Sequence, residues 1–292
     1  MSFRPTRSAL YMPGSNARAL EKAKSLPADA VILDLEDAVS PEQKDTARRQ
    51  VCAAVAAGGF GRRQVVIRIN ALDTPWGAED LAAVAAAKPD AVLLPKPNDA
   101  RDIERATDAL RRAGAPDTLA LWAMVETPLA ILNLRELAGA ARHAGARLTC
   151  LVLGTNDLVK ETRVELDTSR TAALYWLSAS VTAARAFGLM VLDGVYNNFK
   201  DLTGLSAECH QARMLGFDGK TLIHPDQIGA ANEVFAPGID EVVWARKIIA
   251  AFDIPANVGK GVITIDGKMV ELLHAEMVRR TVAIADVIAA QT

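Results

Sequence analysis

Two acidic residues each follow an apolar segment, and their chemistry suits a metal ion. Glu126 ends the run that begins at Leu119, and Asp157 follows the run Leu148–Leu153. If both runs are parallel strands, the two carboxylates emerge at one rim, where they are spaced to share a hard cation. Mg²⁺ is usually held by one or two carboxylates, with waters and substrate oxygens at its other positions. The sequence therefore predicts a Mg²⁺ site formed by Glu126 and Asp157.

Further charged residues stand at the ends of other expected strands. Glu36 and Asp37 follow the run that begins at Ala30, and Arg68 lies in the run Val65–Ile69. The planar Arg68 guanidinium suits a substrate carboxylate or a developing enolate oxygen, and a salt bridge to Glu36 or Asp37 is its alternative role. Glu36 and Asp37 would hold the waters of the ion. We predict catalytic roles for these three residues, although all the rim acids could instead cap helices or pair with cations.

The elements that must position these residues alternate regularly along the chain. Short apolar or β-branched runs are each followed by a longer helical stretch, which indicates repeated strand-helix units on a parallel sheet. About eight such units favour a closed TIM (β/α)₈ barrel over an open doubly wound sheet, whose G-x-G-x-x-G turn is missing here. The expected strands are Ala9–Met12, Ala30–Leu35, Val65–Ile69, Ala91–Pro95, Leu119–Val125, Leu148–Leu153, Met190–Val195 and Thr221–Ile223.

The character of the sequence changes near Pro237-Gly238. We predict a barrel catalytic domain over residues 1–238 and a C-terminal helical extension over residues 239–292. A helix is expected from about Asp240 to Phe252, followed by a glycine-bearing segment and a last helix ending near Ala290. The extension either packs on its own barrel or covers the active site of a neighbouring subunit, and the sequence leaves both open.

Composition bounds the class of protein. The chain has 292 residues, half of them apolar, and a formal charge of only -2, so it can bury a large core. Its mixed, nearly balanced charges argue against nucleic acid or an acidic membrane as a partner, and favour small molecules. No apolar run resembles a membrane span or signal peptide, and the three cysteines lack paired spacing. We therefore expect a cytoplasmic protein with free thiols.

Several short strings, taken in order, resemble one family. The chain is similar to the citrate lyase β-subunit-like branch of the HpcH/HpaI aldolase superfamily, which includes CoA-ester lyases and thioesterases acting on malyl-CoA. The resemblance covers nearly the whole chain. It is carried by Arg7–Gly14, Asp34–Val39, Val66–Asn70, Leu94–Lys96, Glu126–Pro128, Gly154–Leu158, Asp193–Tyr196, Gly216–Lys220 and His224–Gln227.

The resemblance implies a TIM barrel of the phosphoenolpyruvate/pyruvate-binding type, with Mg²⁺ on Glu126 and Asp157 and the substrate carboxylate near Arg68. Members make or break a carbon-carbon bond between a CoA-thioester enolate and a 2-oxo acid, as citryl-, malyl- and citramalyl-CoA lyases do. Some relatives hydrolyse malyl-CoA instead. The resemblance also implies a homo-oligomer, either a trimer or a hexamer.

One string departs from the family pattern. The resemblance to malyl-CoA lyases implies a C-terminal Met-x-Asp string, whose aspartate comes from an adjacent subunit and acts as the acid/base group. This chain has Met269-Val270-Glu271 instead, so a glutamate replaces that aspartate. Glu271 could serve as the base of a lyase, or position water for thioester hydrolysis. It could also simply begin the last helix, where an acid is favourable.

CoA recognition is predicted from basic residues near the first strands. Arg7 and Lys44 could contact its phosphates, and Tyr11 could lie against the pantetheine. Exposed basic residues on helices are the alternative interpretation. The predicted function is Mg²⁺-dependent cleavage of a malyl-, citramalyl- or citryl-CoA-type thioester to acetyl-CoA and a 2-oxo acid. The alternatives are a (3S)-malyl-CoA thioesterase, an aldolase acting on free hydroxy-oxo acids, and a non-catalytic metabolite-binding subunit of a citrate-lyase-like complex.

Overall fold

The computed structural model describes residues 4–290 of the chain. Its contacts divide these residues into two compact units, residues 6–232 and residues 233–290 together with residues 4 and 5. The predicted domain boundary after residue 238 falls a few residues beyond this division. The predicted domains also include residues 1–3 and 291–292, which lie outside the described part of the chain.

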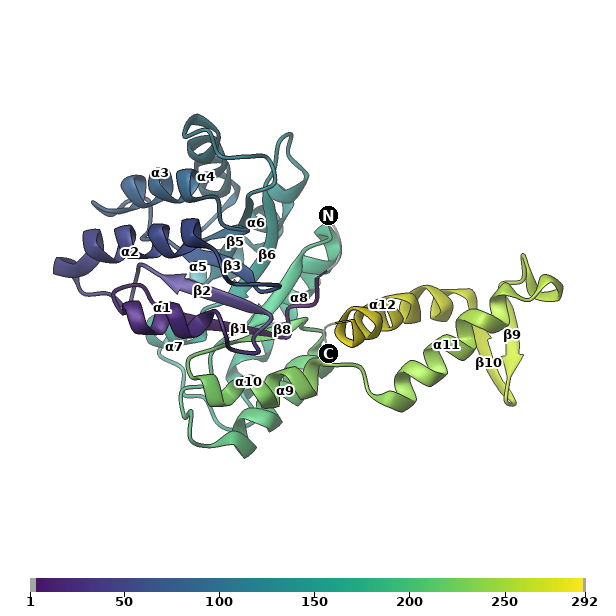
Figure 1. The fold of residues 1–292 in the computed structure, drawn as a ribbon. Coiled ribbons are helices and arrows are strands. Elements are labelled where there is room, and N and C mark those ends of the chain that lie inside the picture. Colours follow the sequence, from purple (N-terminus) through teal and green to yellow (C-terminus); the bar gives the residue numbers. More distant parts are fainter. Residues whose placement is uncertain (1–3, 291–292) are drawn as a thin grey trace. The chain divides into compact units, whose positions relative to one another are not determined.

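The first unit is a closed barrel of parallel strands in sequence order, with β1 pairing β8 (Figure 1). This confirms the predicted TIM-barrel fold. Every expected strand is present, with ends shifted by one or two residues in most cases. The strands are β1 Ser8–Pro13, β2 Ala30–Asp34, β3 Gln64–Arg68, β4 Ala91–Leu94, β5 Ala120–Val125, β6 Leu148–Leu153, β7 Met190–Asp193 and β8 Gly219–Leu222.

Helices follow the strands and supply the outer layer of the barrel. They are α1 Ala17–Ala23, α2 Lys44–Ala57, α3 Gly77–Ala87, α4 Ala100–Arg112, α5 Pro128–Leu132, α6 Leu134–Gly139, α7 Thr155–Thr162, α8 Leu174–Phe187, α9 Leu202–Leu215 and α10 Ile228–Phe235. The Thr127 side chain caps α5 by accepting from the Ala130 backbone N–H, and Pro128 occupies the first helical position. Such starts fix where each strand ends.

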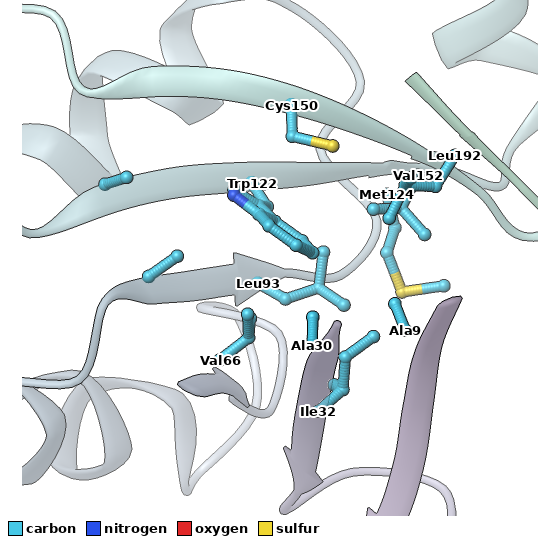
Figure 2. Close-up of a cluster of buried hydrophobic side chains, with 12 residues drawn as sticks. Ala9, Ala30, Ile32, Val66, Leu93, Trp122, Met124, Cys150, Val152 and Leu192 are labelled. Carbon is cyan, nitrogen blue, oxygen red and sulfur yellow. The ribbon is translucent and has the colours of Figure 1, made fainter. Parts of the chain in front are cut away.

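The interior of the barrel is filled by side chains from alternate strand positions. Figure 2 shows the Trp122 ring of β5 beside Leu93 of β4, with Ile32 of β2 and Met124 of β5 in the same buried cluster. Trp122 is fully buried. Because side chains of β5 alternate between the barrel interior and the helix layer, Glu126 lies on the same side of its strand as Trp122 and Met124. The packed interior leaves the carboxyl rim as the place where polar groups can meet a ligand.

The second unit contains α11 Ile239–Asp253, the hairpin of β9 Val262–Ile265 and β10 Lys268–Glu271, and α12 Leu272–Ala289. Both helices match the predicted ones closely. The hairpin was missed, although Asp266-Gly267 between alternating apolar residues is a strong turn signal. Both turn residues have positive φ, 48° and 74°. None of the described helices combines the length and apolar character needed to cross a membrane.

Candidate active site

Glu126 is the most unusual carboxylate of the barrel rim. It follows β5, is 1% exposed, and its Oε1 accepts a 2.8 Å hydrogen bond from the Lys96 backbone N–H. Its Oε2 is buried and has no hydrogen-bond partner among the described residues. Burial, reinforced by the nearby Glu36 carboxylate, raises the pKa of Glu126 to about 8. A buried carboxylate with an unused oxygen is costly unless a cation reaches it.

Asp157 lies in the first turn of α7, directly after β6. Its charge acts on both Glu126 and Lys96, so the structure brings the two predicted metal ligands into one neighbourhood. No group of three or more His, Cys, Asp or Glu side chains in residues 4–290 is arranged to hold an ion. The oxygen donors and the unused Glu126 oxygen fit Mg²⁺, which accepts few protein ligands and keeps several waters.

Lys96 supplies a cation to this cluster that sequence reasoning did not include among the functional residues. Its Nζ lies 3.2 Å from Glu36 Oε1, and its backbone adopts a left-handed conformation with φ of 53°. Burial lowers the pKa of Lys96, but the carboxylates of Glu36, Glu126 and Asp157 outweigh it and raise the pKa. The string Leu94–Lys96 at the end of β4 was the available signal.

Arg68 is buried and held chiefly by Asp34. Its Nε donates a 2.7 Å hydrogen bond to Asp34 Oδ1, and its Nη2 donates one of 2.7 Å to Asp34 Oδ2. Its Nη1 lies 2.9 Å from Glu36 Oε2 and 3.4 Å from Asp37 Oδ2. The expected salt bridges to Glu36 and Asp37 are therefore present, but the main partner, Asp34, was missed. Asp34 ends β2 in register with Arg68 on β3, which a strand alignment would have indicated.

Glu36 and Asp37 differ in exposure although they are adjacent. Glu36 is 7% exposed, and burial raises the pKa of its carboxyl, whereas the Asp37 side chain is 63% exposed. Lys44 sits beneath this turn and donates hydrogen bonds of 2.9 Å to the Leu35 carbonyl and 2.7 Å to the Glu36 carbonyl. The ammonium predicted to contact CoA phosphates is thus tied to the backbone that carries Glu36.

Tyr11 and Met124 line the site below Arg68. The Arg68 guanidinium carbon lies 4.9 Å from the centre of the Tyr11 ring, a cation-π arrangement. The Tyr11 hydroxyl lies 3.9 Å from the Met124 sulfur. Burial raises the pKa of Tyr11, so its hydroxyl stays protonated. Tyr11 is therefore next to the predicted catalytic arginine.

The structure does not bring Arg7 to this site. Arg7 immediately precedes β1, so it lies at the amino ends of the strands, whereas the acids stand at the carboxyl ends. Its guanidinium donates two 2.8 Å hydrogen bonds to Asp29, which precedes β2. This position gives no support to the prediction that Arg7 contacts the CoA phosphates. Its pairing with Asp29 is a structural role.

Glu271 belongs to the second unit. It is the residue at which β10 gives way to α12, and its backbone N–H donates a 3.0 Å hydrogen bond to His274 Nδ1. The expectation that Glu271 begins the last helix is therefore met. Its catalytic role stays a prediction.

A closed parallel barrel with a cluster of carboxylates and a fixed arginine at its carboxyl rim defines a TIM-barrel protein, a class whose active sites lie at this rim. Residues 7–225 match the family described as HpcH/HpaI aldolase/citrate lyase. The chain belongs to this family, as the sequence resemblance indicated.

Individual relatives match over nearly the whole length. The chain is 48% identical over 286 residues to a (3S)-malyl-CoA thioesterase of Cereibacter sphaeroides, covering 98% of this chain and 96% of the relative. It is 37% identical over 273 residues to the citrate lyase subunit beta of Escherichia coli, covering 92% and 89%. The crystal structure of CitE from Mycobacterium tuberculosis in complex with magnesium, acetoacetate and coenzyme A matches with a TM-score of 0.74 at 30% identity, covering 95% and 98%.

Proposed function

We propose that this protein is a Mg²⁺-dependent enzyme acting on a CoA thioester of the malyl-CoA type. The observation that carries the proposal is the buried Glu126 carboxyl, which has an unused oxygen and stands in one cluster with Asp157. A divalent ion would satisfy that oxygen and offset the repulsion between the acids. The magnesium, acetoacetate and coenzyme A bound by the related CitE support the same ligand classes here.

The residues divide the work in a simple way. Glu126 and Asp157 would hold Mg²⁺, which supplies Lewis-acid polarisation of substrate oxygens when bound. Asp34 accepts hydrogen bonds from two nitrogens of Arg68 and so fixes the guanidinium. Its Nη1 faces Glu36 and Asp37, and from there it would contact the anionic part of the substrate. Lys44 fixes the backbone of the turn that carries Glu36. The site is thus rigid before substrate arrives.

Hydrolysis is the outcome that we propose first. It is supported by the (3S)-malyl-CoA thioesterases, which match this chain over 98% of its length at 48% identity. Glu271 in place of the family's aspartate is consistent with a change in outcome. In hydrolysis a water oxygen bonds to the thioester carbonyl carbon, the carbon-sulfur bond breaks, and the thiolate takes up a proton to give free CoA and malate.

Carbon-carbon cleavage is the second candidate, and the Arg68 geometry favours it. A guanidinium held against a cluster of acids suits the negative charge of an enolate oxygen. The citrate lyase subunit beta of E. coli is 37% identical to this chain. Cleavage of malyl-CoA would break the bond between its second and third carbons and give acetyl-CoA and glyoxylate.

The deciding experiment is a product analysis. Purified protein is incubated with malyl-CoA and Mg²⁺, and free CoA plus malate are separated from acetyl-CoA plus glyoxylate. We expect free CoA and malate, with no turnover in EDTA. Acetyl-CoA and glyoxylate would establish the lyase outcome instead. Binding without turnover, for malyl-CoA and then for citramalyl-CoA, would contradict both and leave a metabolite-binding subunit.

The role of Glu271 is tested separately from the reaction. We propose that residues 233–290 supply Glu271 to the barrel of another copy in a homo-oligomer. Mixing an inactive Glu271→Ala chain with an inactive Arg68→Ala chain should then restore activity, because hybrid assemblies contain some complete sites. Full activity of either variant alone, or no recovery of activity in the mixture, would contradict this arrangement. An Asp37→Asn chain mixed with Arg68→Ala serves as the control for dilution.

A further inference from the structure

Two cations stand among the rim acids, and they are held very differently. Asp34 fixes Arg68 with two 2.7 Å hydrogen bonds, and Arg68 is 7% exposed. The Lys96 ammonium makes one longer contact, 3.2 Å to Glu36 Oε1, and its side chain is 37% exposed. A lysine ammonium on a flexible four-carbon stem reorients easily, unlike a gripped guanidinium. Lys96 is therefore the cation of this cluster that can move.

The backbone and the side chain of Lys96 have separate partners. Its N–H donates 2.8 Å to Glu126 Oε1, while its Nζ contacts Glu36. The hydrogen bond from the Lys96 backbone N–H to Glu126 depends only on the main chain. The ammonium can therefore leave Glu36 without breaking that hydrogen bond. The left-handed backbone, with φ of 53°, gives the lysine stem a direction that an ordinary strand end would not.

A divalent cation and this ammonium cannot share the cluster without cost. Both are attracted by the carboxylates of Glu36, Glu126 and Asp157, and they repel each other at short range. A polar cavity of about 230 Å³ borders Lys96 and gives a displaced side chain room to turn. It is lined by Asp73, Asn98 and Thr127, which follow β3, β4 and β5, and by Asp102 and Arg105 of α4.

We propose that Lys96 is a tethered counter-cation, whose ammonium neutralises the acid cluster while no divalent ion is bound. When the ion binds, the ammonium is displaced and then contacts the carboxylate of the acyl group. This role of Lys96 rests on the proposed function, which supplies both the divalent ion and the anionic substrate. It makes Lys96 a competitor of the ion and a binding residue for the substrate. Ion binding thereby prepares the anion site, so that the two bind in a preferred order.

The test measures Mn²⁺ binding to the substrate-free protein, by the loss of the free Mn²⁺ electron paramagnetic resonance signal. The Lys96→Met variant keeps the backbone N–H and loses the charge, so it should bind Mn²⁺ about tenfold more tightly than wild type. Lys96→Arg keeps the charge and should stay within about threefold of wild type. Lys200→Met removes an exposed lysine elsewhere and controls for net charge.

A second arm uses oxalate as a probe of the anion site, measured by calorimetry at saturating Mn²⁺. Lys96→Met should bind oxalate about tenfold more weakly than wild type, because the displaced ammonium is missing. Unchanged or weaker Mn²⁺ binding by Lys96→Met would overturn the counter-cation role, and unchanged oxalate binding would overturn the contact with substrate. Failure of wild type itself to bind Mn²⁺ would instead contradict the metal site of the proposed function.

Discussion

The barrel contains two clusters of buried charge, and their balance differs. Both carboxylate oxygens of Asp193, at the end of β7, accept hydrogen bonds. Oδ2 accepts from Arg170 Nη1 at 2.8 Å and from Lys220 Nζ at 2.7 Å, and Oδ1 accepts from Arg170 Nη1 at 3.0 Å. Burial raises the pKa of Asp193, but these cations outweigh it and lower the pKa. At Glu126 one oxygen has no partner among the described residues, and the pKa is raised to about 8.

From this difference we infer a structural role for the Asp193 cluster and a ligand site at the cluster that includes Glu126. The Asp193 cluster carries two acids and two bases within hydrogen-bond reach, since Lys220 also contacts Glu208. The cluster that includes Glu126 has more acids than cations, and its Lys96 is held by one long contact. Evenly paired buried charges stabilise a fold only if they stay together. A buried excess of one sign marks a place where a ligand completes the charge balance.

Replacement of Glu126 should produce the largest effect and the sharpest contrast. Glu126→Gln removes a carboxylate oxygen of the proposed metal site, and we expect a loss of Mg²⁺-dependent turnover of about a thousandfold or more. Stability in EDTA should stay unchanged or increase, because an uncompensated buried acid is removed. Turnover of malyl-CoA and urea unfolding check both expectations. An active Glu126→Gln enzyme would remove Glu126 from the metal site.

Replacement of Asp193 should have the opposite signature. Asp193→Ala leaves Lys220 and Arg170 buried without their shared partner, so unfolding free energy should fall by about 3–5 kcal/mol. Urea unfolding in EDTA measures this loss. Asp193→Asn is the matched control, because it keeps the shape and part of the hydrogen bonding. A change below about 1 kcal/mol in Asp193→Ala would show that the cluster is not a structural element.

The two clusters should also give stability opposite dependences on pH. The pKa of Glu126 is higher in the folded protein than its ordinary value of 4.5, so its contribution is present below about pH 4.5 and is lost as pH rises to about 8. Asp193 has a lowered pKa, so its contribution is present above its ordinary value of 3.8 and is lost in more acidic solution.

Unfolding in EDTA between pH 5 and 9 tests the Glu126 part. The stability of wild type minus that of Glu126→Gln should fall by a few kcal/mol across this range, and Mg²⁺ at pH 8 should recover part of it. A flat difference would mean that the Glu126 carboxyl ionises normally in the folded protein. Glu42, an exposed acid whose pKa is lowered, provides a Glu42→Gln control that should show no such fall.

Replacement of Lys44 should have an intermediate effect. Lys44→Met removes both hydrogen bonds to the carbonyls before and at Glu36, and burial already lowers the pKa of this ammonium. We expect a 10- to 100-fold loss in kcat/KM, as for residues that orient metal-site groups. Lys22→Met, on the exposed face of α1, is the control. A selective increase in KM for CoA, with kcat unchanged, would instead favour the original prediction of a phosphate contact.

The sequence predicted the fold because the strands are short apolar runs with regular helical connections. It also predicted that Glu126, Asp157, Glu36 and Arg68 would share a rim, because parallel strands bring their carboxyl ends together. It offered the Arg68 salt bridges to Glu36 and Asp37 as an alternative, and they are present, but it did not predict the main partner of Arg68. Asp34 was assigned no role, although its register with Arg68 decides where that guanidinium is held.

The misplaced residues have physical explanations. Arg7 precedes a strand rather than following one, so strand direction alone places it at the opposite end from the acids. Lys44 lies on a helix, where sequence cannot tell a solvated cation from one that bonds backbone carbonyls. The end of β4 placed Lys96 at the rim, but the sequence assigned it no role, because its left-handed backbone and its contact with Glu36 are not indicated by any local pattern.

The smallest expected effect separates two adjacent acids. Asp37 was predicted to act with Glu36, yet its side chain is 63% exposed and lies 3.4 Å from Arg68, while Glu36 is 7% exposed and contacts both Arg68 and Lys96. Solvent screens the Asp37 charge, so Asp37→Asn should change kcat/KM by less than about threefold. The free energy of unfolding should change by less than about 0.5 kcal/mol. Glu36→Gln should change both the Mn²⁺ affinity and kcat/KM by more. If Asp37→Asn matches Glu36→Gln in both measurements, Asp37 must contact the waters of the ion despite its exposure, and burial would not be what distinguishes the functional acids of this rim.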